Sequence, residues 1–289
     1  MVTGAAAGLG RAEAIGLARS GATVVVNDMP AALESSDVLD EISAAGSKAV
    51  AVAGDISQRS TADELVSCAD GLGGLNIVVN NAGITRDRML FNMTDEDWDA
   101  VIAVHLRGHF LLTRNAATYW RNQAKDSGGS VYGRIINTSS EAGLSGPIGQ
   151  ANYGAAKAGI TALTLTASRA LERYGVRANA ICPRARTAMT ADVFGDTPEL
   201  ADGEVDPLSP DHVVTLVRFL ASPAADKVNG QVFIVYGPTV TLVAAPTAEH
   251  RFHADGSAWD PAALTSSMQQ YFADRDPERT FAAIGLMGD

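Results

Sequence analysis

Short, largely apolar runs rich in β-branched residues alternate along the chain with longer segments of helical length. The short runs are Thr23–Asn27, Lys48–Ala53, Ile77–Asn80, Arg134–Thr138, Arg177–Ile181 and Gln231–Val235. The longer segments are Arg11–Ser20, Ser60–Gly71, Asp95–Arg121 and Ala151–Arg173. Apolar runs of this kind are typical of strands that are covered on both faces. The alternation therefore predicts an α/β fold, with a doubly wound parallel sheet and helices on both of its faces.

Two irregular regions depart from this pattern. The segment 189–210 is rich in Asp, Glu, Gly and Pro, and we predict that it is a surface loop or lid. The region 239–289 contains four aromatic residues, which are too many for a disordered end: Trp259, Tyr271, Phe272 and Phe281. We therefore predict one domain in residues 1–289, with a core of residues 1–238 and a packed C-terminal extension of residues 239–289.

The composition narrows the possible partners. Acidic residues outnumber basic ones by 33 to 22, which argues against binding to nucleic acid or to an anionic membrane. No apolar run approaches the ~18 residues of a membrane span, and the start of the chain lacks the layout of a signal peptide. The two cysteines exclude a disulfide framework and a Cys-rich zinc site, so we predict a cytoplasmic protein. His105 and His109 have a spacing compatible with a metal, but no third ligand is evident nearby, and we predict no metal.

A glycine-rich loop precedes the first predicted helix. The segment Thr3–Gly10 (TGAAAGLG) permits a tight turn, and its backbone N–H groups could approach a pyrophosphate at the N-terminus of the helix. Taken alone, the loop could equally be a turn rich in Gly and Ala. The residues that we expect to bind a cofactor here are Gly4, Ala6, Gly8, Leu9 and Gly10.

Polar residues at the ends of three predicted strands strengthen this interpretation. Asp28 lies 18 residues beyond Gly10, where an acid that binds the ribose is expected. Asp55 and Ile56 follow the next strand, and the segment 80–83 follows the one after it. The residues expected to contact a cofactor in that segment are Asn81, Ala82 and Gly83. Ligands bind at the carboxyl ends of strands in sheets of this type, so we predict a Rossmann-type nucleotide site.

Asp28 also bears on the choice of nucleotide. Its carboxylate can accept hydrogen bonds from the ribose hydroxyls and would repel the 2′-phosphate of NADP. The segment 22–33 contains no Arg or Lys that could attract this phosphate. We therefore predict NAD as the cofactor in preference to NADP. In the alternative interpretation, Asp28 only caps the following helix.

Tyr153 alone among the six tyrosines has a lysine four residues later, Lys157. Residues at i and i+4 share one face of a helix, so the ammonium can lie beside the phenol. A nearby positive charge lowers the pKa of a tyrosine from its usual value of about 10, which favours proton exchange near neutral pH. Ser139 and Ser140 follow the strand Arg134–Thr138, and either could hold a substrate oxygen in the same crevice.

These motifs, in this order, resemble the short-chain dehydrogenase/reductase family. The matching segments are TGAAAGLG at 3–10, Asp55, NNAG at 80–83, NTSS at 137–140, YGAAK at 153–157 and NAICP at 179–183. The resemblance selects Ser140 over Ser139 as the group that polarises the substrate oxygen. It implies that Tyr153 is the general acid/base, and that Lys157 lowers the pKa of Tyr153 and holds the nicotinamide ribose. It also places Pro183 and Thr187 at the cofactor, with a spacing about one residue shorter than usual.

A narrower resemblance concerns the substrate. The segments 24–30, 86–114 and 149–159 are similar to the (3R)-hydroxyacyl-CoA dehydrogenase part of the multifunctional enzyme of peroxisomal β-oxidation, and to its bacterial relatives. This resemblance implies an NAD-dependent oxidoreductase that interconverts a secondary alcohol and a ketone by hydride transfer. The substrate would be a 3-hydroxyacyl-CoA or a steroid-like alcohol. Two alternatives are an NADPH-dependent 3-oxoacyl-ACP reductase and a nucleotide sensor without catalysis.

The chain departs from the family pattern at several positions. His105 replaces the usual Asn, whose main-chain carbonyl holds a water that links the catalytic lysine to solvent within a locally distorted helix. We expect His105 either to join this relay as a further catalytic residue or only to pack. Arg184 replaces a Gly, and Tyr236-Gly237-Pro238 replaces Asp-Gly-Gly.

Two expectations about the whole chain also come from the resemblance. Members of the family pair through two long helices, here 95–121 and 151–173, so we expect a homo-oligomer. We favour a dimer over a tetramer, because the region 239–289 should cover or reshape the second interface. The family also has a whole central strand before the glycine loop, where this chain has only Met1–Thr3. We therefore expect the natural protein to begin several residues upstream.

Overall fold

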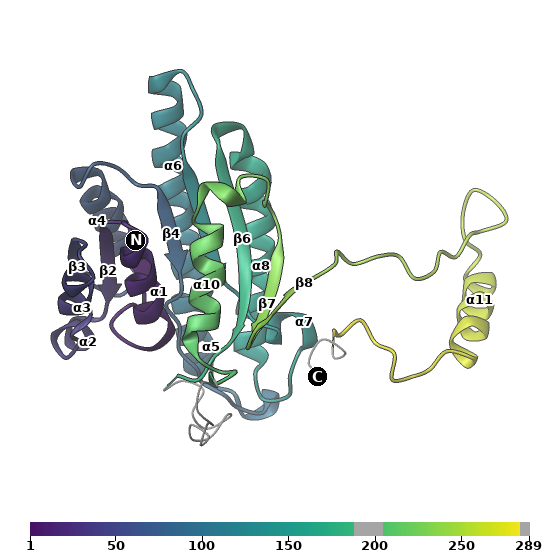
Figure 1. Cartoon of the computed structure of the whole chain (residues 1–289). Helices are drawn as coiled ribbons and strands as arrows, with labels where there is room; N and C mark the ends of the chain where they lie inside the picture. Colours follow the sequence, from purple (N-terminus) through teal and green to yellow (C-terminus); the bar gives the residue numbers. More distant parts are fainter. Residues whose placement is uncertain (188–204, 284–289) are drawn as a thin grey trace. The chain divides into compact units, whose positions relative to one another are not determined.

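The computed structural model describes residues 1–187 and 205–283, and its main feature is one large sheet (Figure 1). In the described residues this sheet has eight strands in the order β3-β2-β1-β4-β5-β6-β7-β8. The strands are β1 (Val2–Thr3), β2 (Val24–Asp28), β3 (Ala49–Ala53), β4 (Ile77–Asn80), β5 (Gly133–Thr138), β6 (Val176–Arg184), β7 (Val232–Tyr236) and β8 (Thr239–Leu242). All neighbouring strands pair in parallel except β7 and β8, which are antiparallel. The predicted doubly wound parallel sheet is confirmed.

Helices cover both faces of the sheet. One face carries α1 (Gly8–Arg19), α3 (Val38–Ala44) and α10 (Pro210–Leu220), and the other carries α4 (Arg59–Gly71), α6 (Gly108–Ser127) and α8 (Ala151–Leu171). Shorter helical elements connect these layers: α2 (Pro30–Glu34), η1 (Leu90–Asn92), α5 (Asp95–Ile102), η2 (Ala103–Arg107), α7 (Ala142–Ser145), η3 (Glu172–Tyr174) and η4 (Pro223–Ala225). No described helix is long and apolar enough to cross a lipid bilayer.

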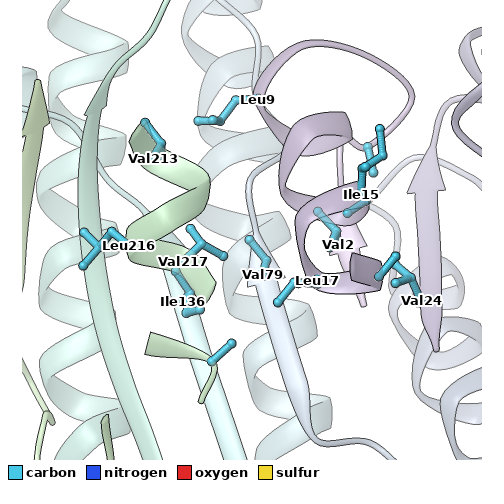
Figure 2. Close-up of a cluster of buried hydrophobic side chains, with 14 of the residues drawn as sticks. Val2, Leu9, Ile15, Leu17, Val24, Val79, Ile136, Val213, Leu216 and Val217 are labelled. Carbon is cyan, nitrogen blue, oxygen red and sulfur yellow. The ribbon is translucent and has the colours of Figure 1, made fainter. Parts of the chain in front are cut away.

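The two faces of the sheet form two separate hydrophobic clusters. Figure 2 shows one of them, to which Val2, Leu17 and Val24 of the first βαβ unit and Val213 and Val217 of α10 all belong. Side chains alternate along a strand, so Val24 and Val26 belong to this cluster while Val25 belongs to the other. Burial on both sides explains why the strands are almost wholly apolar in the sequence.

Most of the predicted elements are found within one to three residues of their expected ends. The elements that were not predicted include the strand β8, the helices α3 and α10, and a helix in the C-terminal region, α11 (Pro261–Ala273). The helix α10 begins at the last residue of the predicted loop 189–210, with the side chain of Ser209 as its N-cap. Residues 189–204 of that prediction lie outside the described residues. The strand β1 pairs with β2 and β4 through Val2 and Thr3 only, and an earlier start of the chain stays a prediction.

The contacts divide the chain into two compact units, Met1–Val243 and Ala244–Asp289. The first unit includes β8, so the sheet continues to Leu242, beyond the core boundary predicted at residue 238. The second unit contains α11, which begins after Asp260 as its N-cap. Within this unit Glu249 accepts hydrogen bonds from Arg275 and Tyr271. That residues 239–289 form a packed extension of one domain stays a prediction.

Candidate active site

A cavity of about 540 Å³ opens at the carboxyl ends of the central strands. Fourteen of the residues predicted for the site lie in its wall: Gly4, Gly8, Leu9, Asp28, Asp55, Ile56, Asn81, Ala82, Gly83, His105, Tyr153, Lys157, Pro183 and Thr187. The wall also includes Ser139, the alternative to Ser140 in the sequence analysis, and residues that the sequence did not single out: Ala7, Asn27, Met29, Gly54, Ile84, Val104, Thr138 and Ala185. Ala6, Gly10 and Ser140 were predicted but do not line the cavity. The described residues contain no group of three or more His, Cys, Asp or Glu that could hold a metal ion.

The glycine loop has a geometry that only glycine accommodates. Gly4 and Gly8 have positive φ angles of 64° and 55°. A Cβ on Gly4 would lie 2.8 Å from Ala82 Cα, and a Cβ on Gly10 would overlap the carbonyl oxygen of Gly4. The loop is therefore closely packed, and the helix α1 begins at its end with no side-chain cap. Uncapped N–H groups at a helix N-terminus are suited to an anionic ligand such as a pyrophosphate.

Asn81 braces this loop from the neighbouring strand. Its backbone N–H donates to Thr3 Oγ1 at 3.0 Å, and its Nδ2 donates to Thr3 O at 3.1 Å. The N–H of Ala82 donates to the same hydroxyl at 3.1 Å. The side chain of Asn81 thus holds the loop in place, in addition to lining the cavity.

The carboxylate of Asp28 is fixed at the end of β2 beside the glycine loop. Its Oδ2 accepts a hydrogen bond from Ala6 N at 3.0 Å, and its Oδ1 accepts one from Met29 N at 2.8 Å. The helix that follows has Met29 at its N-cap and no side-chain cap, so Asp28 does not serve as the helix cap. Among the described residues that line the cavity, Lys157 alone is cationic.

Asp55 is held by its own turn after β3. Its Oδ1 accepts a hydrogen bond from Ser57 N and its Oδ2 accepts one from Ser57 Oγ, both at 2.8 Å. These contacts keep the carboxylate at the cavity wall, where it was expected. Next to it, Ile56 packs so closely on Gly108 that a Cβ there would lie 2.9 Å from Ile56 Cγ2.

The two serines after β5 have different surroundings. Ser139 is buried, and its hydroxyl donates to Lys157 O at 3.0 Å and lies 2.8 Å from Thr161 Oγ1. The Ser140 hydroxyl instead accepts a hydrogen bond from Ala142 N at 3.1 Å, and its interaction with Tyr153 lowers the pKa of the phenol. Ser140 is therefore the hydroxyl available beside Tyr153, which agrees with the choice made from the family resemblance.

The pKa values around Tyr153 differ from the sequence-based expectation. Burial raises the pKa of Tyr153, while the hydrogen bond from Ser140 lowers it. The Lys157 ammonium lies 5.3 Å from the centre of the Tyr153 ring and donates to Thr138 O at 2.6 Å. Burial lowers the pKa of Lys157 to about 7. Ser140 therefore lowers the pKa of Tyr153, and a contribution of Lys157 to this effect stays a prediction.

His105 lies in η2, a π-helical turn between α5 and α6, which confirms the expected distortion of the long helix. Its Nε2 lies 2.8 Å from Ile84 O and 3.0 Å from Ile84 N, so one hydrogen bond forms in either tautomer. The ring meets the Tyr153 ring edge to face, with their centres 5.2 Å apart. Burial, together with the charge of Lys157, lowers the pKa of His105 well below its usual value, so the imidazole is neutral at physiological pH.

The fold and this cavity are those of a nicotinamide-dependent oxidoreductase. The sequence pattern of the short chain dehydrogenase family matches residues 1–197, and the chain belongs to this family. It is 75% identical over 292 residues to the hydroxyacyl-CoA dehydrogenase ChsB1 of Mycobacterium tuberculosis, covering 99% of this chain and 92% of that protein.

Two further similarities extend this relationship. The chain is 39% identical over 244 residues to the peroxisomal multifunctional enzyme type 2 of Mus musculus, covering 81% of this chain and 31% of that protein. A crystal structure of a short chain dehydrogenase from Mycobacterium avium matches with a TM-score of 0.83 and 44% identity, over 96% of this chain and 94% of the other. The predicted membership of the family is confirmed, and so is the similarity to the peroxisomal enzyme.

Proposed function

We propose that the protein is an NAD-dependent dehydrogenase that interconverts the 3-hydroxyl and 3-keto groups of an acyl-CoA thioester. The observation that carries this proposal is the grouping of Tyr153 and the buried ammonium of Lys157 in the cavity wall, with Ser140 acting on the pKa of Tyr153. The identity of 75% to a protein named as a hydroxyacyl-CoA dehydrogenase supports the choice of substrate.

The residues of the cavity suit a dinucleotide. The glycine loop and the uncapped start of α1 would hold the pyrophosphate, and Asp28 would bind the adenosine ribose. Asp55 and Ile56 would contact the adenine, while Pro183 and Thr187 would lie at the nicotinamide end. Because the carboxylate of Asp28 would repel a 2′-phosphate, NAD is preferred to NADP. When bound, the cofactor supplies a nicotinamide ring that exchanges a hydride with the carbinol carbon.

The protein's own groups would then manage the proton of the alcohol. Ser140 donates a hydrogen bond to the substrate oxygen and keeps it next to the Tyr153 hydroxyl. Tyr153 takes the proton as the alcohol is oxidised, or gives it back as the ketone is reduced. Lys157, whose pKa is about 7, can pass this proton onward near neutral pH. A positioned general acid/base of this kind contributes about 10²–10⁴-fold to the rate.

The surface beside Tyr153 favours a substrate with a bulky apolar part. The N–H of Arg88 donates to Gly149 O at 2.9 Å, which places the segment 88–91 alongside the segment that leads into α8. Three large apolar side chains on these two segments are mostly exposed: Leu90 (73%), Phe91 (80%) and Ile148 (86%). Together they offer an apolar rim of the kind that an acyl or steroid-like chain could cover.

We also infer that the chain forms a homodimer through its long helices. Trp98 of α5, Phe110 of α6 and Leu165 of α8 are large apolar side chains that remain partly exposed in the single chain. Burying such side chains across a two-fold axis would stabilise a pair of chains.

A turnover screen tests the proposed reaction. The wild-type protein should reduce NAD with 3-hydroxyacyl-CoA substrates, while Tyr153→Phe should keep cofactor affinity and lose about 10²-fold or more in kcat. Tyr119→Phe is a matched control, because Tyr119 bonds Asp70 away from the cavity. Turnover only with NADPH and 3-oxoacyl-ACP would contradict the proposal, and nucleotide binding without any turnover would support the sensor alternative.

A further inference from the structure

Arg184 and Glu141 form an ion pair next to the candidate active site. The proposed reaction gives this ion pair no role. Arg184 Nε donates to Glu141 Oε2 and Arg184 Nη2 donates to Glu141 Oε1, each at 2.7 Å. The two side chains are only 18% and 12% exposed. A shielded, two-point contact between a guanidinium and a carboxylate fixes both position and orientation, unlike most ion pairs on a surface.

The pair lies at the carboxyl ends of two neighbouring strands that carry site residues. Glu141 directly follows Ser140 after β5, and Arg184 directly follows Pro183 of the cavity wall at the end of β6. The ladder of paired residues between β5 and β6 ends at Thr138 and Ile181. The ion pair therefore continues the connection between the strands beyond the last ladder position.

Ser140 is held from both sides. On one side, the hydroxyl of Ser139 is anchored on α8 through Lys157 O and Thr161. On the other side, the carbonyl oxygen of Glu141 accepts hydrogen bonds from the N–H groups of Leu144 and Ser145, the last two residues of α7. The side chain of Glu141 adds the contact to Arg184, so the backbone on each side of Ser140 is anchored.

A third strand supports Arg184. The guanidinium carbon lies 5.2 Å from the centre of the Tyr236 ring, and the two residues are register partners on β6 and β7. A stacked guanidinium loses little further freedom when it binds a carboxylate. Arg184 and Tyr236 stand at two of the positions where this chain departs from the family pattern.

We propose that Arg184 and Glu141 are positioning residues that hold the Ser140 hydroxyl against the phenol of Tyr153. This inference rests on the proposed function, because it assigns the pair a role in the same acid/base site. The hydrogen bond from Ser140 lowers the pKa of Tyr153. Loss of the ion pair should therefore raise the pKa of Tyr153 and slow the chemical step, with little change in the binding of NAD.

Kinetics of matched variants test this role. Glu141→Ala and Arg184→Gly should each lower kcat by about tenfold, with NAD affinity and KM changed less than about twofold. The double variant should be no slower than either single variant, because both changes remove the same contact. Arg184→Lys, which keeps the charge but not the two-point contact, should be intermediate.

A control ion pair at the other end of the same strands separates positioning from stability. Asp226 accepts from Arg134, at the start of β5, and lies near Arg177 of β6. Asp226→Asn should lower the melting temperature and leave kcat unchanged. An equal loss of kcat in Asp226→Asn and Glu141→Ala would overturn the positioning role, as would additive losses in the double variant of Arg184 and Glu141.

The pH dependence gives a readout that does not need an identified substrate. Ultraviolet absorbance of tyrosinate, compared with a Tyr153→Phe background, reports the titration of Tyr153 alone. Its midpoint should move to higher pH in Glu141→Ala and Arg184→Gly, and stay at the wild-type value in Asp226→Asn. An unmoved midpoint in both variants would overturn the inference. A wild-type protein that turns over no alcohol would contradict the proposed function and leave this readout intact.

Discussion

Glu13 is a buried acid, and its titration should make the stability of the protein depend on pH. It lies in α1, is fully buried, and neither of its carboxylate oxygens has a hydrogen-bond partner among the described residues. One turn later, a Cβ on Gly16 would overlap Cγ1 of Val214, so α1 and α10 pack closely beside it. Burial raises the pKa of Glu13 from 4.5 to about 8, and the group is protonated in the folded protein at neutral pH.

The size of the effect follows from this difference in pKa. Between pH 4.5 and about 8, the folded chain holds a proton that the unfolded chain has released. The free energy of unfolding therefore falls as the pH rises through this window, by about 1.4 kcal/mol per pH unit. The full difference corresponds to about 5 kcal/mol, and about 2–3 kcal/mol of it falls between pH 6 and 8. Above about pH 8 this contribution becomes constant.

The variant Glu13→Gln removes the titration while keeping the size of the side chain. Urea unfolding at pH 6, 7, 8 and 9 would compare this variant with the wild type and with Glu64→Gln, an exposed position in the middle of α4. The free energy of unfolding of Glu13→Gln should increase relative to wild type by about 2–3 kcal/mol from pH 6 to 8. Glu64→Gln should show no such trend. A pH-independent difference between Glu13→Gln and wild type would refute the reasoning, because it would mean that Glu13 does not bind a proton on folding.

Three further predictions concern the cofactor, the relay and the assembly. NAD should bind at least tenfold more tightly than NADP, a difference of about 1.4 kcal/mol in binding free energy. Asp28→Ala should remove most of this preference. Equal affinities of the wild-type protein for NAD and NADP in a direct titration would contradict this prediction. If the imidazole of His105 belongs to a proton relay, His105→Ala should lower kcat about tenfold with little change in NAD affinity, and His105→Asn should restore most of the rate. Wild-type rates for His105→Ala from pH 6 to 9 would leave His105 a packing residue. Light scattering should show a dimer, and a stable tetramer over a wide concentration range would overturn that preference.

Most strands could be predicted from the sequence because buried strands are rich in apolar residues. Continuous apolar runs appear at buried strands such as β2 (VVV) and β4 (IVV), where helices cover both faces of the sheet. The missed strand β8 is exposed along its whole length and carries Thr at alternate positions, so its sequence lacks such a run. Helix α10 was missed for a different reason, because its first residue is the Pro that closes a loop-like segment.

Some features of the candidate site could likewise be predicted from the sequence, and others could not. The residues at strand ends and the Tyr153–Lys157 spacing could be found from the sequence, since each is a local pattern with a chemical meaning. The contact between Arg184 and Glu141 could not, because it joins positions 43 residues apart and depends on the register of β5 and β6. The direction of the Lys157 ammonium toward Thr138 likewise depends on how α8 packs against β5.

The sequence by itself determined the fold class, the family and most of the residues around the cavity. Hydrophobic periodicity, turn residues and motif spacing extend over only a few residues, so they can be read directly from the amino-acid sequence. The tertiary structure decided that the Lys157 ammonium bonds Thr138 O, that Arg184 contacts Glu141, and that Glu13 is buried without a hydrogen-bond partner among the described residues. These properties depend on distance and on exclusion of water, and both arise only when segments far apart in the chain pack together.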